Sequence, residues 1–116
     1  MAAAGGCAEP FIEATVELED TSDREGPYQV WTVIVGVDRS DAIELHYAIN
    51  GGNQRNAQMR KTDDAGEDPG ELYRGAIPGQ DSGAVISYSV AVVRDGAVVE
   101  VDPPEGEPAF VFSVTP

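Results

Sequence analysis

Residues 85–94 read VISYSVAVVR, and they are followed by Asp95-Gly96 and by the apolar stretch 97–101 (AVVEV). In the first segment apolar side chains alternate with smaller or polar ones, which is the two-residue period of a half-buried β-strand. An Asp-Gly pair between two such runs favours a tight hairpin, because both residues tolerate positive φ. The stretch therefore predicts two antiparallel strands whose buried face includes Ile86, Tyr88, Val90 and Val92.

Further strands are predicted on the N-terminal and C-terminal sides of this hairpin. Residues 28–37 (YQVWTVIVGV) are apolar on both faces, which is typical of a central strand covered on both sides or covered by a partner. Residues 43–49 alternate and end in Asn50-Gly51, a turn signal. The other predicted strands are 12–18, with Ile12, Ala14, Val16 and Leu18 on one face; 57–61, with Met59 inward; 72–78, with Tyr73, Gly75 and Ile77 on one face; and 109–115.

The length and composition fit one all-β domain. The chain has 116 residues, and its 13 glycines and 8 prolines fall between the apolar runs. Seven or eight short antiparallel strands at this spacing predict a single β-sandwich over residues 11–116, preceded by a flexible tail at 1–10. No stretch approaches the roughly 20 apolar residues of a membrane-spanning helix, so we expect no transmembrane segment.

The charge is strongly negative, with 21 acidic residues against 7 basic ones and a net charge of −14. Such a surface repels nucleic acid and anionic lipid headgroups, so neither is expected as a partner. The acidity is consistent with a solvated, soluble surface, with a salt-adapted organism or with weak calcium binding. Carboxylate oxygens are calcium ligands, and the candidate calcium site is Asp63, Asp64, Glu67 and Asp68, although these residues match no EF-hand loop.

Cys7 is the only cysteine, so no internal disulfide can form. Small residues run into it (MAAAGGC) and resemble the end of a bacterial lipoprotein signal, in which the cysteine is acylated. Ala4 replaces the usual leucine, and the charged and hydrophobic regions of a signal are absent. Two interpretations stay open: a lipid anchor at Cys7, or an incidental thiol in a flexible tail.

Four stretches carry a family resemblance through their order and spacing: GPYQV at 26–30, IELHY at 43–47, LYRGAIPGQ at 72–80 and GAVISYSVA at 83–91. Over residues 10–116 the chain resembles the fibronectin type III and immunoglobulin-like modules of bacterial secreted or surface proteins. The resemblance implies that Tyr88, at the start of the sixth strand, folds back on the corner preceding it. It also implies an extracellular or cell-surface spacer, adhesion or docking role, with a protein or polysaccharide surface as partner.

The sequence offers no catalytic arrangement. His46 is the only histidine, and its neighbours in the sequence supply neither a nucleophile nor an orienting partner. Cys7 has no basic neighbour that would activate its thiol. Ser82, Ser87 and Ser89 lie in no nucleophile-elbow motif. We therefore expect a protein that is not an enzyme and that needs no cofactor other than the candidate calcium ion.

The candidate interaction residues lie on two strands. If Tyr28 and its alternate neighbours face the core, Trp31, Val33 and Val35 point outward in a row. Either neighbouring segments cover this row, or it is an exposed apolar strip of the kind that marks a binding surface. Phe110 and Phe112, in the final strand, are candidates for pairing with another chain at a sheet edge.

Three functions remain open at this point. The first is a non-catalytic binding, adhesion or spacer module of a secreted or surface-anchored bacterial protein. The second is a structural subunit of an extracellular or viral-type assembly, which self-associates through edge strands and the Trp31 strip. The third is an accessory domain of a secreted hydrolase.

Overall fold

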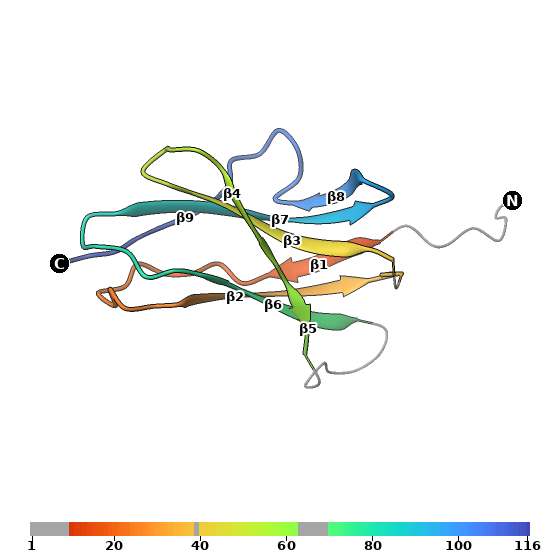
Figure 1. Ribbon diagram of the computed structural model, residues 1–116, viewed down its shortest axis with the longest axis horizontal. Helices are drawn as coiled ribbons and strands as arrows, with labels where there is room; N and C mark the ends of the chain where they lie inside the picture. Colours follow the sequence, from red (N-terminus) through yellow and green to blue (C-terminus); the bar gives the residue numbers. More distant parts are fainter. Residues whose placement is uncertain (1–9, 39, 63–69) are drawn as a thin grey trace, which may run out of the picture.

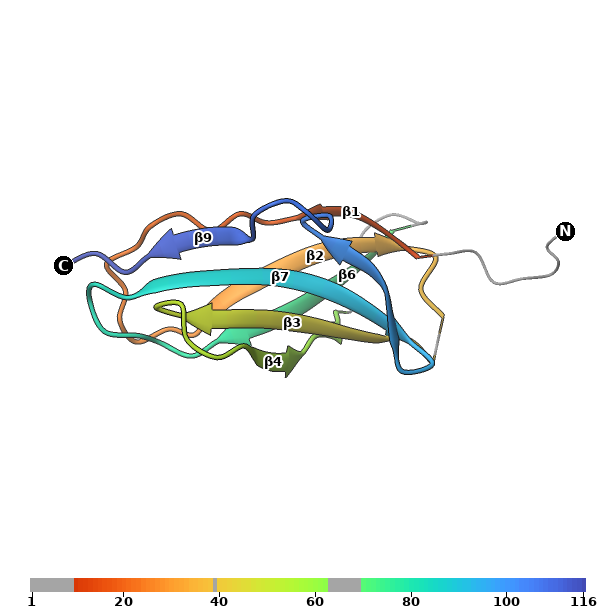
Figure 2. The same ribbon diagram turned by 90° about the horizontal axis from the view of Figure 1, so that it is seen from above.

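The computed structural model describes residues 10–38, 40–62 and 70–116, and these residues form two antiparallel β-sheets packed face to face (Figure 1; Figure 2 shows the view from above). The described residues contain no helix, and hence none that could cross a membrane. The described residues form nine strands: β1 (Phe11–Thr15), β2 (Tyr28–Val35), β3 (Ala42–Ile49), β4 (Arg55–Gln58), β5 (Arg60–Lys61), β6 (Glu71–Ile77), β7 (Val85–Arg94), β8 (Ala97–Asp102) and β9 (Phe110–Ser113).

One sheet has the strand order β1-β2-β6-β5, and the other has β4-β3-β7-β8 with β9 also pairing with β7. The prediction of an all-β sandwich is confirmed, with nine strands in place of seven or eight. The inward faces of β6 and β7 are those that the alternation predicts: Tyr73, Gly75 and Ile77 on β6, and Ile86, Tyr88, Val90 and Val92 on β7, are buried.

The first strand differs from the prediction because its register changes. Ile12 lies opposite Ile34, but Ala14 lies opposite Val33, so one extra residue is inserted between them. Such a bulge reverses the faces of the residues that follow it. Ile12 is therefore buried, whereas Val16 is 43% exposed on the outer face.

A single predicted strand at 57–61 is divided between the two sheets. β4 pairs with β3 in one sheet, and β5 pairs with β6 in the other. Met59 lies at the crossover, buried as predicted, and its N–H donates to the Ile43 carbonyl at 2.8 Å. A Cβ at Gly75 would lie only 2.9 Å from Met59 Cγ, so the glycine makes room for the crossing segment, which Figure 1 shows running from one layer to the other.

The β7–β8 hairpin has the predicted two-residue turn. Asp95 and Gly96 have φ values of 53° and 79°, and Arg94 pairs with Ala97 directly across the turn. Positive φ at both central positions is the geometry that matches the twist of the flanking strands. The Asp-Gly signal is therefore confirmed in its position and in its conformation.

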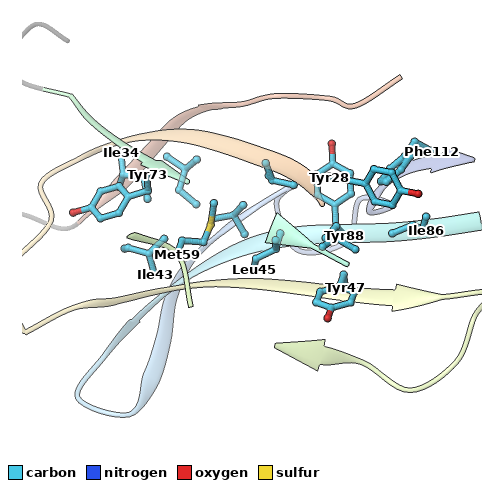
Figure 3. Packing of buried hydrophobic residues seen from close by; sticks show 14 of the residues in the cluster. Tyr28, Ile34, Ile43, Leu45, Tyr47, Met59, Tyr73, Ile86, Tyr88 and Phe112 are labelled. Atoms are coloured by element: carbon cyan, nitrogen blue, oxygen red, sulfur yellow. The ribbon is translucent and has the colours of Figure 1, made fainter. Parts of the chain in front are cut away.

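The core lies between the sheets and includes an aromatic cluster at one end (Figure 3). The Phe112 ring meets the Tyr28 ring edge to face, with centroids 5.2 Å apart, and the Tyr88 ring at 6.0 Å. Edge-to-face pairs add to the stabilisation from burial alone. Met59, Ile43 and other residues from both sheets continue the core toward the opposite end, as Figure 3 shows.

The predicted role of Tyr88 at the corner preceding its strand is wrong. Its hydroxyl donates to the Val16 carbonyl at 2.7 Å and accepts from the Leu18 N–H at 2.8 Å, so it holds the chain segment that follows β1. Tyr28 holds the expected corner instead, because its hydroxyl accepts from the Gln80 N–H at 3.1 Å and donates to the Asp23 carbonyl at 2.7 Å. Each hydroxyl thus joins a buried ring to a loop.

Replacing Tyr88 by phenylalanine is expected to lower the free energy of unfolding by about 1–3 kcal/mol, because the Val16 carbonyl and Leu18 N–H lose their partner. Urea denaturation followed by tryptophan fluorescence measures the change. The control is Tyr47→Phe, since Tyr47 is buried but makes no hydrogen bond through its hydroxyl in the described part of the chain. Equal effects of the two variants would contradict a specific role for the Tyr88 hydroxyl.

A buried ion pair fixes the β2–β3 connection to the end of β7. Arg94 Nε donates to Asp41 Oδ1 at 2.7 Å, and the Arg94 Nη2 group donates to Asp41 Oδ2 at 2.7 Å. The Asp41 side chain has no exposed area, and its Oδ2 also accepts from the Asp38 N–H at 2.8 Å. The hydrogen bonds from Arg94 hold the pKa of Asp41 below its ordinary 3.8, against the opposing effect of burial.

Candidate functional site

The outer face of the β1-β2-β6-β5 sheet carries a continuous apolar surface centred on Trp31. Residues directly opposite each other in a ladder share a face, and Val33 lies opposite both Ala14 on β1 and Leu72 on β6. Phe11 is 59% exposed at one end of this surface. We call the surface the Trp31 face; its apolar residues are Phe11, Ala14, Val16, Trp31, Val33, Val35, Leu72 and Ala76.

Trp31, Val33 and Val35 are half-buried on this face, between β1 and β6. The Arg74 guanidinium carbon lies 5.5 Å from the centre of the Trp31 ring, a cation–π arrangement that fixes both side chains. Arg60 lies directly opposite Arg74 on β5, and Gln29 is exposed two residues before Trp31. Arg74 is thus the cation at the Trp31 ring, and Arg60 lies one strand further along the same face, on a chain whose net charge is −14.

The side chains of Phe110 and Phe112 lie on the inner side of the final strand, and pairing of this strand's edge with another chain stays a prediction. Phe112 is 1% exposed because it lies opposite Ile86 on the inner side of the sheet. Phe110 faces the same way, and its ring lies 5.3 Å from the Tyr88 ring. The free side of β9 is also partly covered: Thr21 N–H donates to the Ser113 carbonyl at 3.0 Å. The Phe112 side chain is therefore part of the core.

His46 has an orienting partner that the sequence reasoning missed. Its Nε2 lies 2.8 Å from Glu44 Oε1, two residues earlier on the same face of β3. Ser89 lies directly opposite His46 on β7, but in the described residues no hydrogen bond joins the two side chains. Side chains two positions apart on a strand lie on the same face, so the spacing of Glu44 and His46 could have predicted this pair. Within the described ranges, the histidine is held by a carboxylate and no hydroxyl is hydrogen-bonded to it.

Burial raises the pKa of two tyrosine hydroxyls above the ordinary value of 10. Burial, together with the neighbouring Glu71 carboxylate, raises the pKa of Tyr73 to about 12. Its hydroxyl lies 3.2 Å from Glu71 Oε1 and donates to it. Burial likewise raises the pKa of Tyr88. At neutral pH both groups act as hydrogen-bond donors that organise the sandwich.

Two sequence-predicted sites lie outside the described residues. These are the candidate calcium ligands Asp63, Asp64, Glu67 and Asp68, and the candidate acylation site Cys7. Across residues 10–38, 40–62 and 70–116, no group of three or more histidine, cysteine, aspartate or glutamate side chains is placed to hold a metal ion.

Comparison with known proteins gives similarity in structure only. No known protein family and no curated protein matches the chain. The cycloalternan-forming enzyme from Listeria monocytogenes, solved with a pentasaccharide substrate, matches at a TM-score of 0.59 and 17% identity over 79% of this chain. An uncharacterized Listeria monocytogenes EGD-e protein, solved with glucose, magnesium and calcium, matches with the same values. The chain spans only 8% of the length of each of these two proteins.

A further similar structure is the carbohydrate-binding module of the muscle glycogen-targeting subunit of protein phosphatase-1. It matches with a TM-score of 0.56 and 6% identity, over 92% of this chain and 76% of the module. At these identities the similarity concerns the fold, and the chain thus shares a β-sandwich with a carbohydrate-binding module and with one part of a sugar-processing enzyme.

Proposed function

We propose that this chain is a non-catalytic binding module of the fibronectin type III or immunoglobulin type, and that it binds polysaccharide through the Trp31 face. The observation that carries the proposal is the half-buried Trp31 on the outer face of the β1-β2-β6-β5 sheet, with the Arg74 guanidinium 5.5 Å from the centre of its ring. A pyranose ring has a face of C–H groups that packs on an aromatic ring, while its hydroxyls need polar partners at the rim.

The polar groups around Trp31 suit such a ligand. Arg74 and Arg60 offer several N–H donors in fixed planes, and the exposed Gln29 amide offers both a donor and an acceptor. The apolar residues along β1 and β2 extend the surface beyond the Trp31 ring, so it could contact several consecutive sugar units of a polysaccharide chain. The similarity in fold to a carbohydrate-binding module agrees with this assignment.

The same surface serves a second candidate function, that of an accessory domain of an enzyme that acts on polysaccharide. The observation in its favour is that a fold of this kind forms a small part, 8% of the length, of the Listeria cycloalternan-forming enzyme. In either function this chain would contribute binding rather than chemistry.

Replacing Trp31 by alanine is expected to weaken polysaccharide binding by more than about 2 kcal/mol, roughly thirty-fold in Kd, because it removes the stacking surface. The measurement is affinity gel electrophoresis against soluble starch, laminarin and xylan, followed by calorimetry with the polysaccharide that retards the protein most. Arg74→Ala is expected to give a smaller loss.

The control is Val111→Ser, which changes an exposed residue of the other sheet outside the Trp31 face. Thermal unfolding of each variant shows that the comparison is made on folded protein. Migration of the wild type unaffected by all three polysaccharides would contradict the proposed function. Retardation that W31A leaves unchanged would place the sugar-binding surface away from the Trp31 face.

A further inference from the structure

A second surface lies where the edges of the two sheets meet. An open groove of about 770 Å³ runs between β1 and β8 and is continued by the loop 103–109. Phe11 and Ile12 line its β1 side, and residues 98–102 line its β8 side. Figure 2 shows β1 and β8 next to each other at this edge of the sandwich. We call this surface the β8 groove.

The β8 side of the groove is apolar and has an unpaired strand edge. Val98 and Val99 are 54% and 41% exposed, and Phe11 on the opposite side is 59% exposed. In the described part of the chain β8 pairs only with β7, so its other edge carries backbone groups without a strand partner. An extended peptide can add to such an edge through backbone hydrogen bonds, while alternate side chains contact the surface.

The groove also carries negative charge. Four carboxylate residues line it, Glu100, Asp102, Glu105 and Glu107, and no lysine or arginine is among its lining residues. The Glu100 carboxylate accepts a hydrogen bond from the Ile12 N–H at 3.1 Å, so it is engaged in joining the two strands. Glu105 and Glu107 are exposed in the loop beyond β8 and are open to a partner.

From these features we propose that the β8 groove binds an extended, cationic segment of another protein. Apolar side chains of that segment would contact Val98, Val99 and Phe11, and its alternate lysine or arginine side chains would pair with Glu105 and Glu107. Charge complementarity selects this occupant, because the groove and the whole chain are negative. A second copy of the chain fits poorly, since it would set a net charge of −14 and the same carboxylates against each other.

The test uses a fluorescein-labelled peptide of eight alternating lysine and valine residues, with a glutamate and valine peptide of the same pattern for comparison. Fluorescence anisotropy should show binding of the cationic peptide only, with an affinity that falls as salt is added. The double variant E105Q/E107Q is expected to weaken binding by about tenfold. V98S/V99S is expected to weaken it as well, through loss of the apolar contact.

A matched control separates the groove from the general acidity of the chain. E19Q/E25Q removes the same amount of charge from two exposed positions outside the groove and should bind the peptide like the wild type. Equal weakening by both double variants, or equal binding of the two peptides, would overturn the proposal. W31A should keep its affinity for the cationic peptide, so a failure of polysaccharide binding and a failure of the groove are distinguished in the same set of variants.

Discussion

Replacing Phe112 by alanine is expected to lower the free energy of unfolding by about 3–5 kcal/mol, the range for a large aromatic side chain removed from a packed core. Phe112 is 1% exposed, and its ring packs against the rings of Tyr28 and Tyr88 from two other strands. Alanine would leave a cavity between the sheets and remove both edge-to-face contacts. Urea denaturation, with the slope checked for two-state behaviour, measures the loss.

The neighbouring Val111 supplies the control. It belongs to the same strand but is 56% exposed, on the opposite face. Val111→Ala is expected to change the stability by less than about 0.5 kcal/mol, as surface substitutions usually do. A small effect of F112A would contradict the core position of the ring.

Replacing Arg94 by methionine is expected to cost about 3 kcal/mol of stability, because it leaves the Asp41 carboxylate buried without its counter-charge. This value is at the lower end for a broken buried pair, since 18% of the Arg94 side chain stays exposed to water. The Asp38 N–H, which also binds Asp41, compensates only in part.

The exposed pair Lys61–Glu71 provides the comparison. Its nitrogen and oxygen lie 2.9 Å apart, but the side chains are 54% and 35% exposed. Lys61→Met is expected to cost no more than about 1 kcal/mol, because water screens an exposed pair. If K61M and R94M destabilise the protein equally, burial does not make the Arg94–Asp41 pair stronger than an exposed pair.

The Arg94–Asp41 pair also predicts a dependence on pH. The pKa of Asp41 is lower in the folded chain than its ordinary 3.8, so its ionised form stabilises the fold at pH values above 3.8. This contribution is lost as the pH falls through the lower, folded pKa. The difference in unfolding free energy between wild type and D41N should therefore be full at pH 7 and shrink below pH 3.8. If wild type and D41N differ in unfolding free energy by the same amount at pH 7 and below pH 3.8, the Asp41 carboxylate does not stabilise the fold through its ionised form.

The sequence predicts best where strands are long and regular. On β7 the alternation identifies every inward residue from Ile86 to Val92, and the Asp95-Gly96 turn is found in the predicted conformation. It fails where one residue changes the register, because the extra residue in β1 turns Val16 outward. Neither the bulge nor the division of 57–61 between two sheets has a signature in local alternation, since both arise from pairing with distant strands.

For the candidate surfaces too, local alternation predicts which residues point outward but not which distant residues lie beside them. The outward row of Trp31, Val33 and Val35 can be derived from the period of β2 alone, whereas the Arg74 stack depends on the pairing of β2 with β6. The β8 groove could not be predicted from local sequence patterns. Its two sides are joined by a hydrogen bond between Ile12 and Glu100, which are 88 positions apart in the sequence. Only the packed arrangement brings such residues together.

The crossover at Met59 gives the sandwich a mechanical property. Because β4 and β5 are consecutive pieces of one backbone that bond to different sheets, shear between the layers would have to break ladder hydrogen bonds in both. The Tyr88 hydroxyl on β7, which bonds to the chain segment that follows β1, adds a second tie between the layers. The two layers should therefore resist sliding over each other and respond to force as one stiff body.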